Sequence, residues 1–186
     1  MVRAFVAIKI DPDVARSIGE AQSNLNTAFT GIRWVKPENL HLTLKFLGSV
    51  GDDKVTQIAD ALERALHPTP RFTVACRGLG VFPDIRKAKV LWVGLEGKPL
   101  AHLAATVEDA LAPMGFAREK RAFKPHLTIG RWRDSAGRSD LLRRELERSQ
   151  RQDFGSSQVN EVIFFQSVLK PGGAVYTPLK IFPLRG

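Results

Sequence analysis

The sequence predicts an α+β protein with antiparallel sheets, in which the second half of the chain repeats the architecture of the first. Segments with the two-residue alternation of strands and the 3.6-residue period of helices occur in the same order in both halves: strand, helix, strand, helix, strand. The middle strand of each half carries one pattern, His-Leu-Thr-aliphatic, at residues 41–44 and 126–129. No linker or low-complexity segment separates the halves. We therefore expect one domain over residues 1–186, with pseudo-symmetric halves of about 1–80 and 81–186.

Three strands and two helices are expected in the first half. The strands are residues 3–10, 41–47 and 72–76. Asp11 is a candidate N-cap for the first helix, and Pro12 suits its first turn, where a proline loses no helical hydrogen bond. Apolar residues at helical spacing continue this helix to about Phe29. A second helix opens at Asp52 or Asp53 and ends before two prolines.

The second half is expected to repeat this order and then to close the chain with a hairpin. Its strands are residues 89–95 and 126–131, and its helices are residues 98–112 and about 138–150. The hairpin strands are residues 159–169 and 174–181, joined by a turn of sequence Lys-Pro-Gly-Gly.

The composition is that of an ordinary globular protein. Hydrophobic residues make up 44% and charged residues 25%, and no stretch is long and apolar enough to span a bilayer. The first residues alternate like a strand and lack the features of a secretory signal peptide. The single Cys76 excludes an internal disulfide framework and a multi-cysteine zinc site. We therefore expect a cytoplasmic location, and nothing in the sequence requires a membrane, an obligate protein partner or more than a monomer.

The charge balance points to polyanionic partners. The formal net charge is +9, and residues 118–151 alone hold eleven Lys or Arg against five Asp or Glu. A basic balance of this kind favours nucleic acid as the first candidate partner. For the stretch 118–151 by itself, a solvated basic helix is the simpler interpretation.

Two of the four histidines, His41 and His126, begin the repeated pattern. With independent positions, two such matches arise by chance on the order of one time in a thousand. Residues two apart on a strand share a face, so His41 lies beside Thr43, and His126 lies beside Thr128. The aliphatic residues between them face the core. If a pseudo-twofold axis relates the halves, two imidazoles and two hydroxyls converge on one groove.

Such a groove suits the hydrolysis of a phosphodiester. One neutral histidine takes a proton from the attacking water, and the other, protonated, gives a proton to the leaving oxygen. The hydroxyls of Thr43 and Thr128 donate hydrogen bonds to the non-bridging oxygens, where charge builds in the transition state. The sequence has no metal-ligand spacing and no phosphate-binding loop, so we expect no metal and no cofactor. This reasoning leaves open which histidine is the acid and which the base.

Phe46 and Arg131 occupy equivalent positions, each five residues after its histidine. Uninterrupted alternation would turn both toward the core, but Gly130 would permit a bulge that re-aims Arg131. Since a buried unpaired guanidinium is costly, we expect Arg131 to hold the phosphate or stack on the base. Phe46 is a candidate for packing on the other face of the base, with a core position as an equal alternative.

The remaining polar candidates have simpler interpretations. Lys45 and Lys124 share the faces of the two histidines and could lower their pKa values, although a solvent-exposed position is the expectation for each. His67 is expected at a helix end and His102 on a helix surface. Cys76 is expected to be a small strand residue and not a nucleophile.

At these residues the chain resembles the 2H phosphoesterase superfamily, and within it the bacterial and archaeal RNA 2′,3′-cyclic phosphodiesterases, also called 2′-5′ RNA ligases. Residues 34–48 and 123–131 are similar to the two signatures of that family, and residues 3–8 and 167–176 to its first strand and its closing hairpin. The resemblance covers almost the whole chain and shows no departure at the catalytic positions.

The resemblance implies a bilobal fold with the active groove between two sheets and the helices outside them. It implies that a 2′,3′-cyclic phosphate at an RNA end or on a nucleotide is opened to a 2′-phosphate. By this resemblance His41 is the proton donor and His126 the proton acceptor. It also implies reversible, ATP-independent joining of RNA ends through a 2′-5′ linkage.

Two other functions stay open on the sequence alone. One is a nucleotide- or RNA-binding module that has kept the groove but lost turnover. The other is a phosphodiesterase for a small cyclic nucleotide metabolite. A turnover assay on cyclic phosphates distinguishes these from the leading hypothesis.

Overall fold

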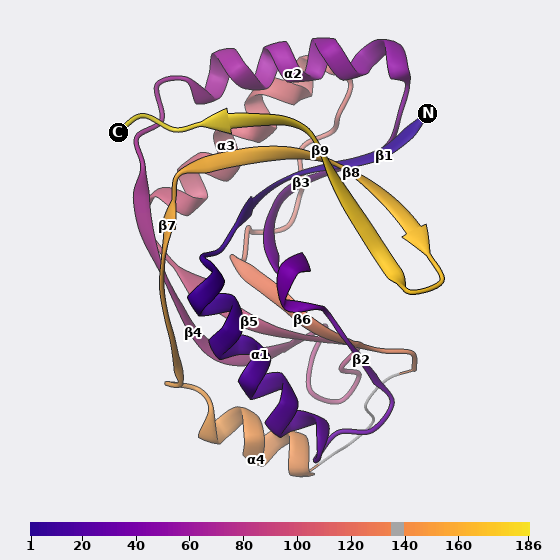
Figure 1. Cartoon of the computed structure of the whole chain (residues 1–186), viewed down its shortest axis with the longest axis vertical. Helices are drawn as coiled ribbons and strands as arrows, with labels where there is room; N and C mark the ends of the chain where they lie inside the picture. Colours follow the sequence, from indigo (N-terminus) through magenta and orange to yellow (C-terminus); the bar gives the residue numbers. More distant parts are fainter. Residues whose placement is uncertain (135–139) are drawn as a thin grey trace.

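The computed structural model describes residues 1–134 and 140–186 and contains two antiparallel sheets (Figure 1). Sheet A has the order β3 (His41–Val50), β1 (Val2–Lys9), β8 (Glu161–Lys170), β9 (Gly173–Pro183). Sheet B has the order β2 (Ile32–Trp34), β6 (His126–Trp132), β5 (Val90–Glu96), β4 (Phe72–Phe82), β7 (Asp153–Val159). Every strand pair inside the sheets is antiparallel, which confirms the predicted fold class.

The path of the chain interleaves the two sheets. Sheet A takes β1 and β3 from the start of the chain and the hairpin β8–β9 from its end. Sheet B takes the strands between them and also β2, which pairs with β6 across almost one hundred residues of sequence. The last hairpin extends beyond the rest of sheet A (Figure 1).

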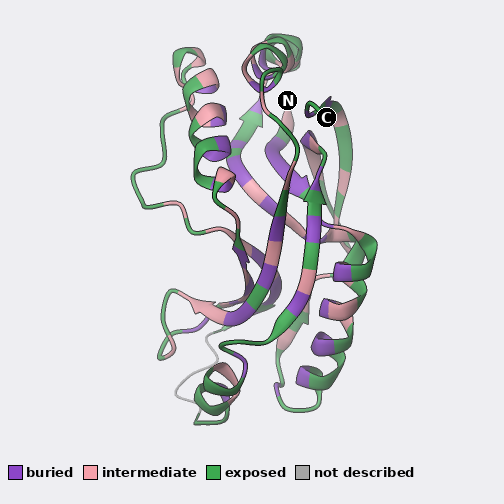
Figure 2. Ribbon diagram, turned by 90° about the vertical axis from the view of Figure 1, so that its left-hand side faces the viewer, coloured by how far each residue is buried: buried purple, intermediate pink, exposed green. Residues whose placement is uncertain are grey.

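Within the described residues, four α-helices lie outside the sheets. Helices α2 (Asp52–Leu66) and α3 (Pro99–Leu111) lie together over sheet A, while α1 (Pro12–Asn26) and α4 (Asp140–Arg148) pack on sheet B (Figure 1). Each of the long helices buries one stripe of apolar side chains and exposes the opposite face, as the periodicity predicts (Figure 2). The part of the expected fourth helix at 138–139 falls outside the described residues.

The buried apolar side chains of residues 1–134 and 140–186 form two clusters. The main core joins the helix-covered faces of both sheets. A smaller cluster lies on the other face of sheet A and contains Phe5, Ala7, Ile163 and Phe165, with Tyr176 packed against them. On β1 the residues between these, such as Val6, belong to the main core, so this strand is buried on both faces. Among the described residues, no helix has the length and apolarity needed to cross a bilayer.

Several element ends differ from the sequence-based expectations. The first helix ends at Asn26 instead of about Phe29, and the strand expected at 72–76 continues to Phe82. The segment expected as one strand at 159–169 follows a separate strand, β7, that sequence reasoning missed, as it missed β2. β2 has three residues and β7 is mostly polar, so neither carries enough alternating apolar residues to be recognised.

Asp11 stands at the N-cap of α1, but its side chain does not cap the helix. Its carboxylate instead accepts a hydrogen bond from the backbone N–H of Gln158 on β7 at 2.9 Å, and its own N–H donates to Ser157 Oγ at 2.8 Å. The expected capping residue therefore ties the start of α1 to sheet B.

Candidate active site

The two histidine-bearing strands meet where the sheets adjoin. β3 is the edge strand of sheet A, β6 lies one strand from the edge of sheet B, and the two strands lie against each other (Figure 1). The positive charge of His126 lowers the pKa of His41, and that of Arg131 lowers the pKa values of both histidines. The structure thus brings His41, His126 and Arg131 to one place, although 85 residues of sequence separate the two histidines.

Hydrogen bonds to backbone carbonyls determine which ring nitrogen of each histidine can exchange a proton with a substrate. His41 Nδ1 lies 2.7 Å from the carbonyl oxygen of Asn39, and His126 Nδ1 lies 2.7 Å from that of Lys124. A carbonyl oxygen only accepts hydrogen bonds, so each Nδ1 carries its proton and donates it. In both rings Nε2 is therefore the nitrogen that can exchange a proton with a substrate. Sequence reasoning missed these contacts, although the partner stands two residues before the histidine in both halves.

Aromatic rings hold each imidazole in place. The His41 ring lies 4.9 Å from Phe5 and 5.1 Å from Tyr176, measured between ring centroids. The His126 ring lies 4.9 Å from Phe82 and 6.2 Å from Trp92. None of these four residues was a predicted site residue. The apolar surroundings restrict the orientation of the rings and reduce their contact with water.

Burial and neighbouring positive charge shift both histidines in the same direction. Burial lowers the pKa of His41, and the charges of Arg131, Lys9 and His126 lower it further, while the hydrogen bond to Asn39 opposes these effects. Burial also lowers the pKa of His126, again with Arg131 as a contributing charge and the hydrogen bond to Lys124 opposing. In the free protein both rings therefore favour the neutral form near pH 7.

A β-bulge follows each threonine of the repeated pattern. In the pairing of β3 with β1, Thr43 lies opposite Ala7 and Lys45 opposite Val6, so Leu44 is the extra residue. In the pairing of β6 with β5, Thr128 lies opposite Trp92 and Gly130 opposite Leu91, so Ile129 is the extra residue. Both threonines lie half-buried beside their histidines, as expected.

The bulges reverse the faces of the residues that follow. Arg131 is exposed, and its charge reaches both histidines, which confirms the prediction that a bulge re-aims it. Phe46 is 68% exposed, with its ring 6.0 Å from Phe5, so the alternative of a core position for Phe46 is wrong. It lies on the histidine side of sheet A because the extra residue Leu44 shifts the alternation by one.

A buried glutamine on α1 supports the second bulge. The side-chain amide of Gln22 donates hydrogen bonds of 2.8 Å to the carbonyl oxygens of both Val35 and Ile129. The backbone N–H of Val35 donates to the same Ile129 carbonyl at 2.9 Å. The carbonyl oxygen of Ile129, the extra residue of the bulge, therefore accepts hydrogen bonds from both the Gln22 amide and the Val35 N–H. A signal was present in the sequence, because Gln22 is a polar residue among the apolar positions of the first helix.

The expectation of an exposed Lys45 was wrong. The Lys45 side chain is 5% exposed, and its Nζ donates to Glu108 Oε2 on α3 at 2.5 Å and to the Ala117 carbonyl at 2.8 Å. The bulge at Leu44 turns Lys45 away from His41 and toward α3. Lys124 is exposed, as expected, but the charges that lower the histidine pKa values are those of Arg131 and Lys9.

The other histidines and the cysteine stand where they were expected. His67 caps the end of α2 and accepts a hydrogen bond from Arg185 at 2.8 Å, and His102 is exposed on α3. Cys76 is buried in β4, and this burial, with the nearby charges of Asp153 and Asp11, raises the pKa of its thiol to about 12. A thiol of this kind is a poor nucleophile.

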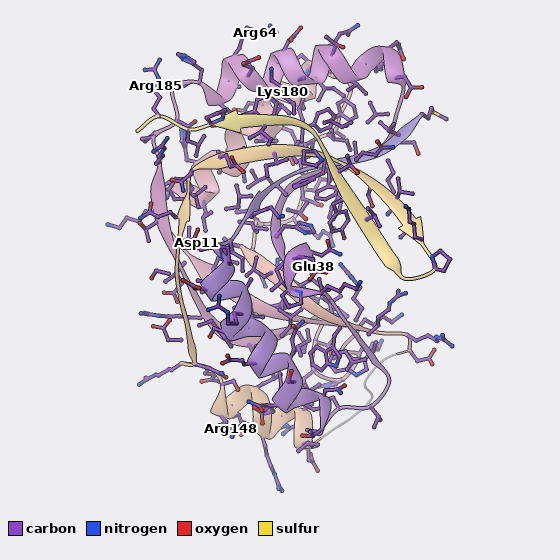
Figure 3. The ribbon with its side chains drawn as sticks, in the orientation of Figure 1. Asp11, Glu38, Arg64, Arg148, Lys180 and Arg185 are labelled. Atoms are coloured by element: carbon purple, nitrogen blue, oxygen red, sulfur yellow. The ribbon has the colours of Figure 1, made fainter. Side chains whose placement is uncertain are left out.

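A cavity of about 660 Å³ lies between α1 and the short helix η1 (Pro37–Asn39), which carries Glu38 (Figure 3). It approaches the candidate site through Lys9, but neither histidine lines it. Among residues 1–134 and 140–186, no group of three or more His, Cys, Asp or Glu side chains is placed to hold a metal ion.

A model of the family described as "LigT like Phosphoesterase" matches the chain twice, at residues 8–92 and 93–176. Among curated proteins, an RNA 2′,3′-cyclic phosphodiesterase of Methanothermobacter thermautotrophicus is 36% identical over 184 residues, which are 98% of this chain and 99% of that protein. One of Archaeoglobus fulgidus is 34% identical over 183 residues, covering 97% and 99%.

Solved structures show the same fold. The crystal structure of a Thermus thermophilus protein superposes with a TM-score of 0.84 at 28% identity, covering 99% of this chain and 98% of that one. The crystal structure of E. coli LigT complexed with 3′-AMP superposes with a TM-score of 0.80 at 28% identity, covering 100% and 99%.

Proposed function

Because the chain belongs to the LigT-like phosphoesterase family, we propose that it hydrolyses 2′,3′-cyclic phosphates at RNA ends to 2′-phosphates by acid–base catalysis with His41 and His126. The observation that carries this proposal is the meeting of two Nδ1-protonated histidines and one arginine at the junction of β3 and β6. The two curated relatives, both named RNA 2′,3′-cyclic phosphodiesterase, support the choice of substrate.

In the proposed reaction, water attacks the phosphorus atom and the bond from phosphorus to the 3′-oxygen breaks. Nε2 of His126 takes the proton of the water, and Nε2 of His41 gives a proton to the departing 3′-oxygen. The products are a 2′-phosphate and a 3′-hydroxyl. The assignment of His41 as donor and His126 as acceptor follows the family resemblance.

The lowered pKa of His41 in the free protein is compatible with this role. The bound phosphate carries a negative charge, and an opposite charge nearby favours the protonated form of a histidine. Substrate binding therefore raises the pKa of His41, so that the ring takes up a proton from solvent and can give it to the leaving oxygen. The reaction requires only the side chains of the protein, so no metal and no cofactor enter the proposal.

The neighbouring residues are proposed to bind the substrate. The hydroxyls of Thr43 and Thr128 hydrogen-bond the non-bridging oxygens, and the guanidinium of Arg131 neutralises their charge. The exposed ring of Phe46, packed on Phe5, offers a flat surface on which the nucleobase stacks.

A 5′-hydroxyl of a second RNA can replace water as the nucleophile in the same ring opening. The bond from phosphorus to the 5′-oxygen then forms as the bond to the 3′-oxygen breaks, so we also propose reversible, ATP-independent 2′-5′ joining of RNA ends. We propose a monomer in the cytoplasm, where the free thiol of Cys76 would stay reduced.

The test is product analysis after incubation with an oligonucleotide that ends in a 2′,3′-cyclic phosphate. Wild-type protein should release a 2′-phosphate end at the same rate with and without EDTA. His41→Ala and His126→Ala should each lower kcat by about 10²–10⁴-fold, the usual share of general acid or base catalysis. His102→Ala is the matched control, because this histidine is exposed on α3.

Binding of the oligonucleotide without turnover would contradict the proposal and support a binding module. Turnover of small cyclic nucleotides but of no RNA end would support the metabolite enzyme instead. A 3′-phosphate product would show that the other phosphorus–oxygen bond breaks.

A further inference from the structure

A second arginine lies directly beside Arg131. Arg33 on β2 is the cross-strand partner of Arg131 on β6, and both are exposed. Ile32 and Trp34 flank Arg33 on β2. A Cβ atom added to Gly130 would lie 2.5 Å from Ile32 Cδ1 and 3.2 Å from Trp34 Cε3, so both side chains lie over Gly130. These neighbours face the core, so Arg33 faces the same side of sheet B as Arg131.

Two like charges directly opposite each other destabilise a pair of strands. No carboxylate within residues 1–134 and 140–186 forms an ion pair with either guanidinium. The chain forms ion pairs at several other arginines, such as Arg77 with Asp153. An uncompensated pair of arginines next to the histidines is an arrangement that an anionic ligand would stabilise.

We propose that Arg33 binds the phosphodiester that precedes the terminal nucleotide, so that the RNA chain leaves the active site over the edge strand β2. This inference rests on the proposed function and extends it from the cyclic phosphate to the next phosphate of the chain. Arg131 lies on the histidine strand β6 and its charge lowers the pKa values of both histidines, whereas Arg33 lies on β2, one strand further out in sheet B.

The geometry divides the terminal nucleotide between the two sheets. Its base lies toward sheet A, where Phe46 and the aromatic cluster around Phe5 are found. Its 5′-phosphate lies toward sheet B, where Arg33 stands on the outermost strand. A mononucleoside 2′,3′-cyclic phosphate has no 5′-phosphate and cannot use this contact.

The experiment compares kcat/KM for two substrates, adenosine 2′,3′-cyclic phosphate and the dinucleotide ApA ending in a 2′,3′-cyclic phosphate. In wild-type protein the dinucleotide should be the better substrate. Arg33→Ala should reduce its advantage about tenfold, as expected for the loss of one hydrogen bond to a charged group. Arg33→Gln, which keeps a long side chain without the charge, should do the same. The slope of log kcat/KM against log salt should become shallower by about 0.7 for the dinucleotide.

The control is Arg64→Ala, which removes the same charge from the outer helix α2, away from β2 and β6 (Figure 3). It should leave the ratio of the two substrates unchanged. Thermal unfolding of the ligand-free Arg33 variants provides a second measurement. Their midpoints should equal or exceed that of the wild-type protein, because a repulsive pair has been removed.

Three outcomes would overturn the inference. An unchanged substrate ratio with unaltered rates, or an equal loss on both substrates, would show that Arg33 does not bind the preceding phosphate. A clearly lower unfolding midpoint of both variants would show that Arg33 does not repel Arg131, which removes the premise of the inference. If the wild-type protein turned over neither substrate, the proposed function itself would fail, which the wild-type measurement reveals before any variant is compared.

Discussion

Each candidate catalytic histidine is oriented by a backbone atom close to it in the chain. The carbonyl oxygens of Asn39 and Lys124, two residues before the rings, accept the Nδ1 hydrogens and leave Nε2 for the substrate. Asn39 has a further role, because its side-chain amide donates to the Ala174 carbonyl on β9 at 3.1 Å. The strand that carries Tyr176 is thereby linked to the residue that orients His41.

The pH dependence of activity should respond to Arg131. Its positive charge lowers the pKa values of both histidines, so Arg131→Gln should raise both. The pH profile of kcat/KM should then move to higher pH, in addition to any loss in substrate binding. Titration of the imidazole C–H resonances by NMR measures the shift directly in the ligand-free protein. Unchanged titration curves would remove Arg131 from the neighbourhood of the histidines, and Arg64→Ala provides the reference.

At the scale of elements, the paired bulges determine which side chains the two strands present to the candidate site. Without the extra residues Leu44 and Ile129, alternation would place Phe46 and Arg131 on the core side. The two halves support their bulges differently. Gly130 leaves room for Ile32 and Trp34 of β2, whereas the equivalent Lys45 fills the corresponding space with a long side chain.

The ion pair of Lys45 and Glu108 should be a strong determinant of stability. It joins β3 to α3. Lys45 also donates a hydrogen bond to the Ala117 carbonyl, which links β3 to the segment that precedes β6. Lys45→Met leaves the carboxylate of Glu108 largely buried without a partner, which should cost about 3–5 kcal/mol. The double variant Lys45→Met with Glu108→Leu should recover much of this loss.

Urea unfolding of the wild-type protein, both single variants and the double variant measures this coupling. Additive losses in the double variant would show that the two side chains do not depend on each other in the folded protein.

At the scale of the whole molecule, which has a net charge of +9, some of the described arginines form ion pairs with carboxylates and others do not. In the stretch 118–151, several arginines pair with carboxylates, among them Arg118 with Asp109, Arg121 with Glu119, and Arg148 with Glu145. α4 lies at the end of the molecule remote from α2 (Figure 1), and its side chains Arg143, Arg144 and Arg148 are exposed, so a solvated basic helix is our interpretation of it. Arg33 and Arg131, for which the described part of the chain provides no carboxylate partner, lie opposite each other on β2 and β6.

Salt should therefore lower kcat/KM for long substrates by screening the charges at the candidate site and not those on α4. The value of kcat/KM for an oligonucleotide with a cyclic phosphate end should fall as salt rises, more steeply than that for a mononucleoside cyclic phosphate. Arg143→Gln with Arg144→Gln, which neutralises two charges on α4, should leave the salt slope unchanged. A shallower slope in this double variant would place α4 on the path of the RNA.

Local patterns were sufficient to predict much of this protein. Alternation and helical spacing are properties of a few consecutive residues, so the α+β class, the long helices and the strands of His41 and His126 could be predicted from the sequence. The repeated pattern also identified the four polar side chains of the candidate site, because a chance repeat is improbable.

Contacts between distant segments decided the rest. The partners of β2 and β7, the burial of Lys45 and the support of a bulge by Gln22 all depend on residues far away in the sequence. Alternation assumes an uninterrupted ladder, and only the neighbouring strands and helices determine where an extra residue is accommodated. That is why Phe46 could be assigned to the histidine side, and Arg33 recognised beside Arg131, only once the tertiary structure was known.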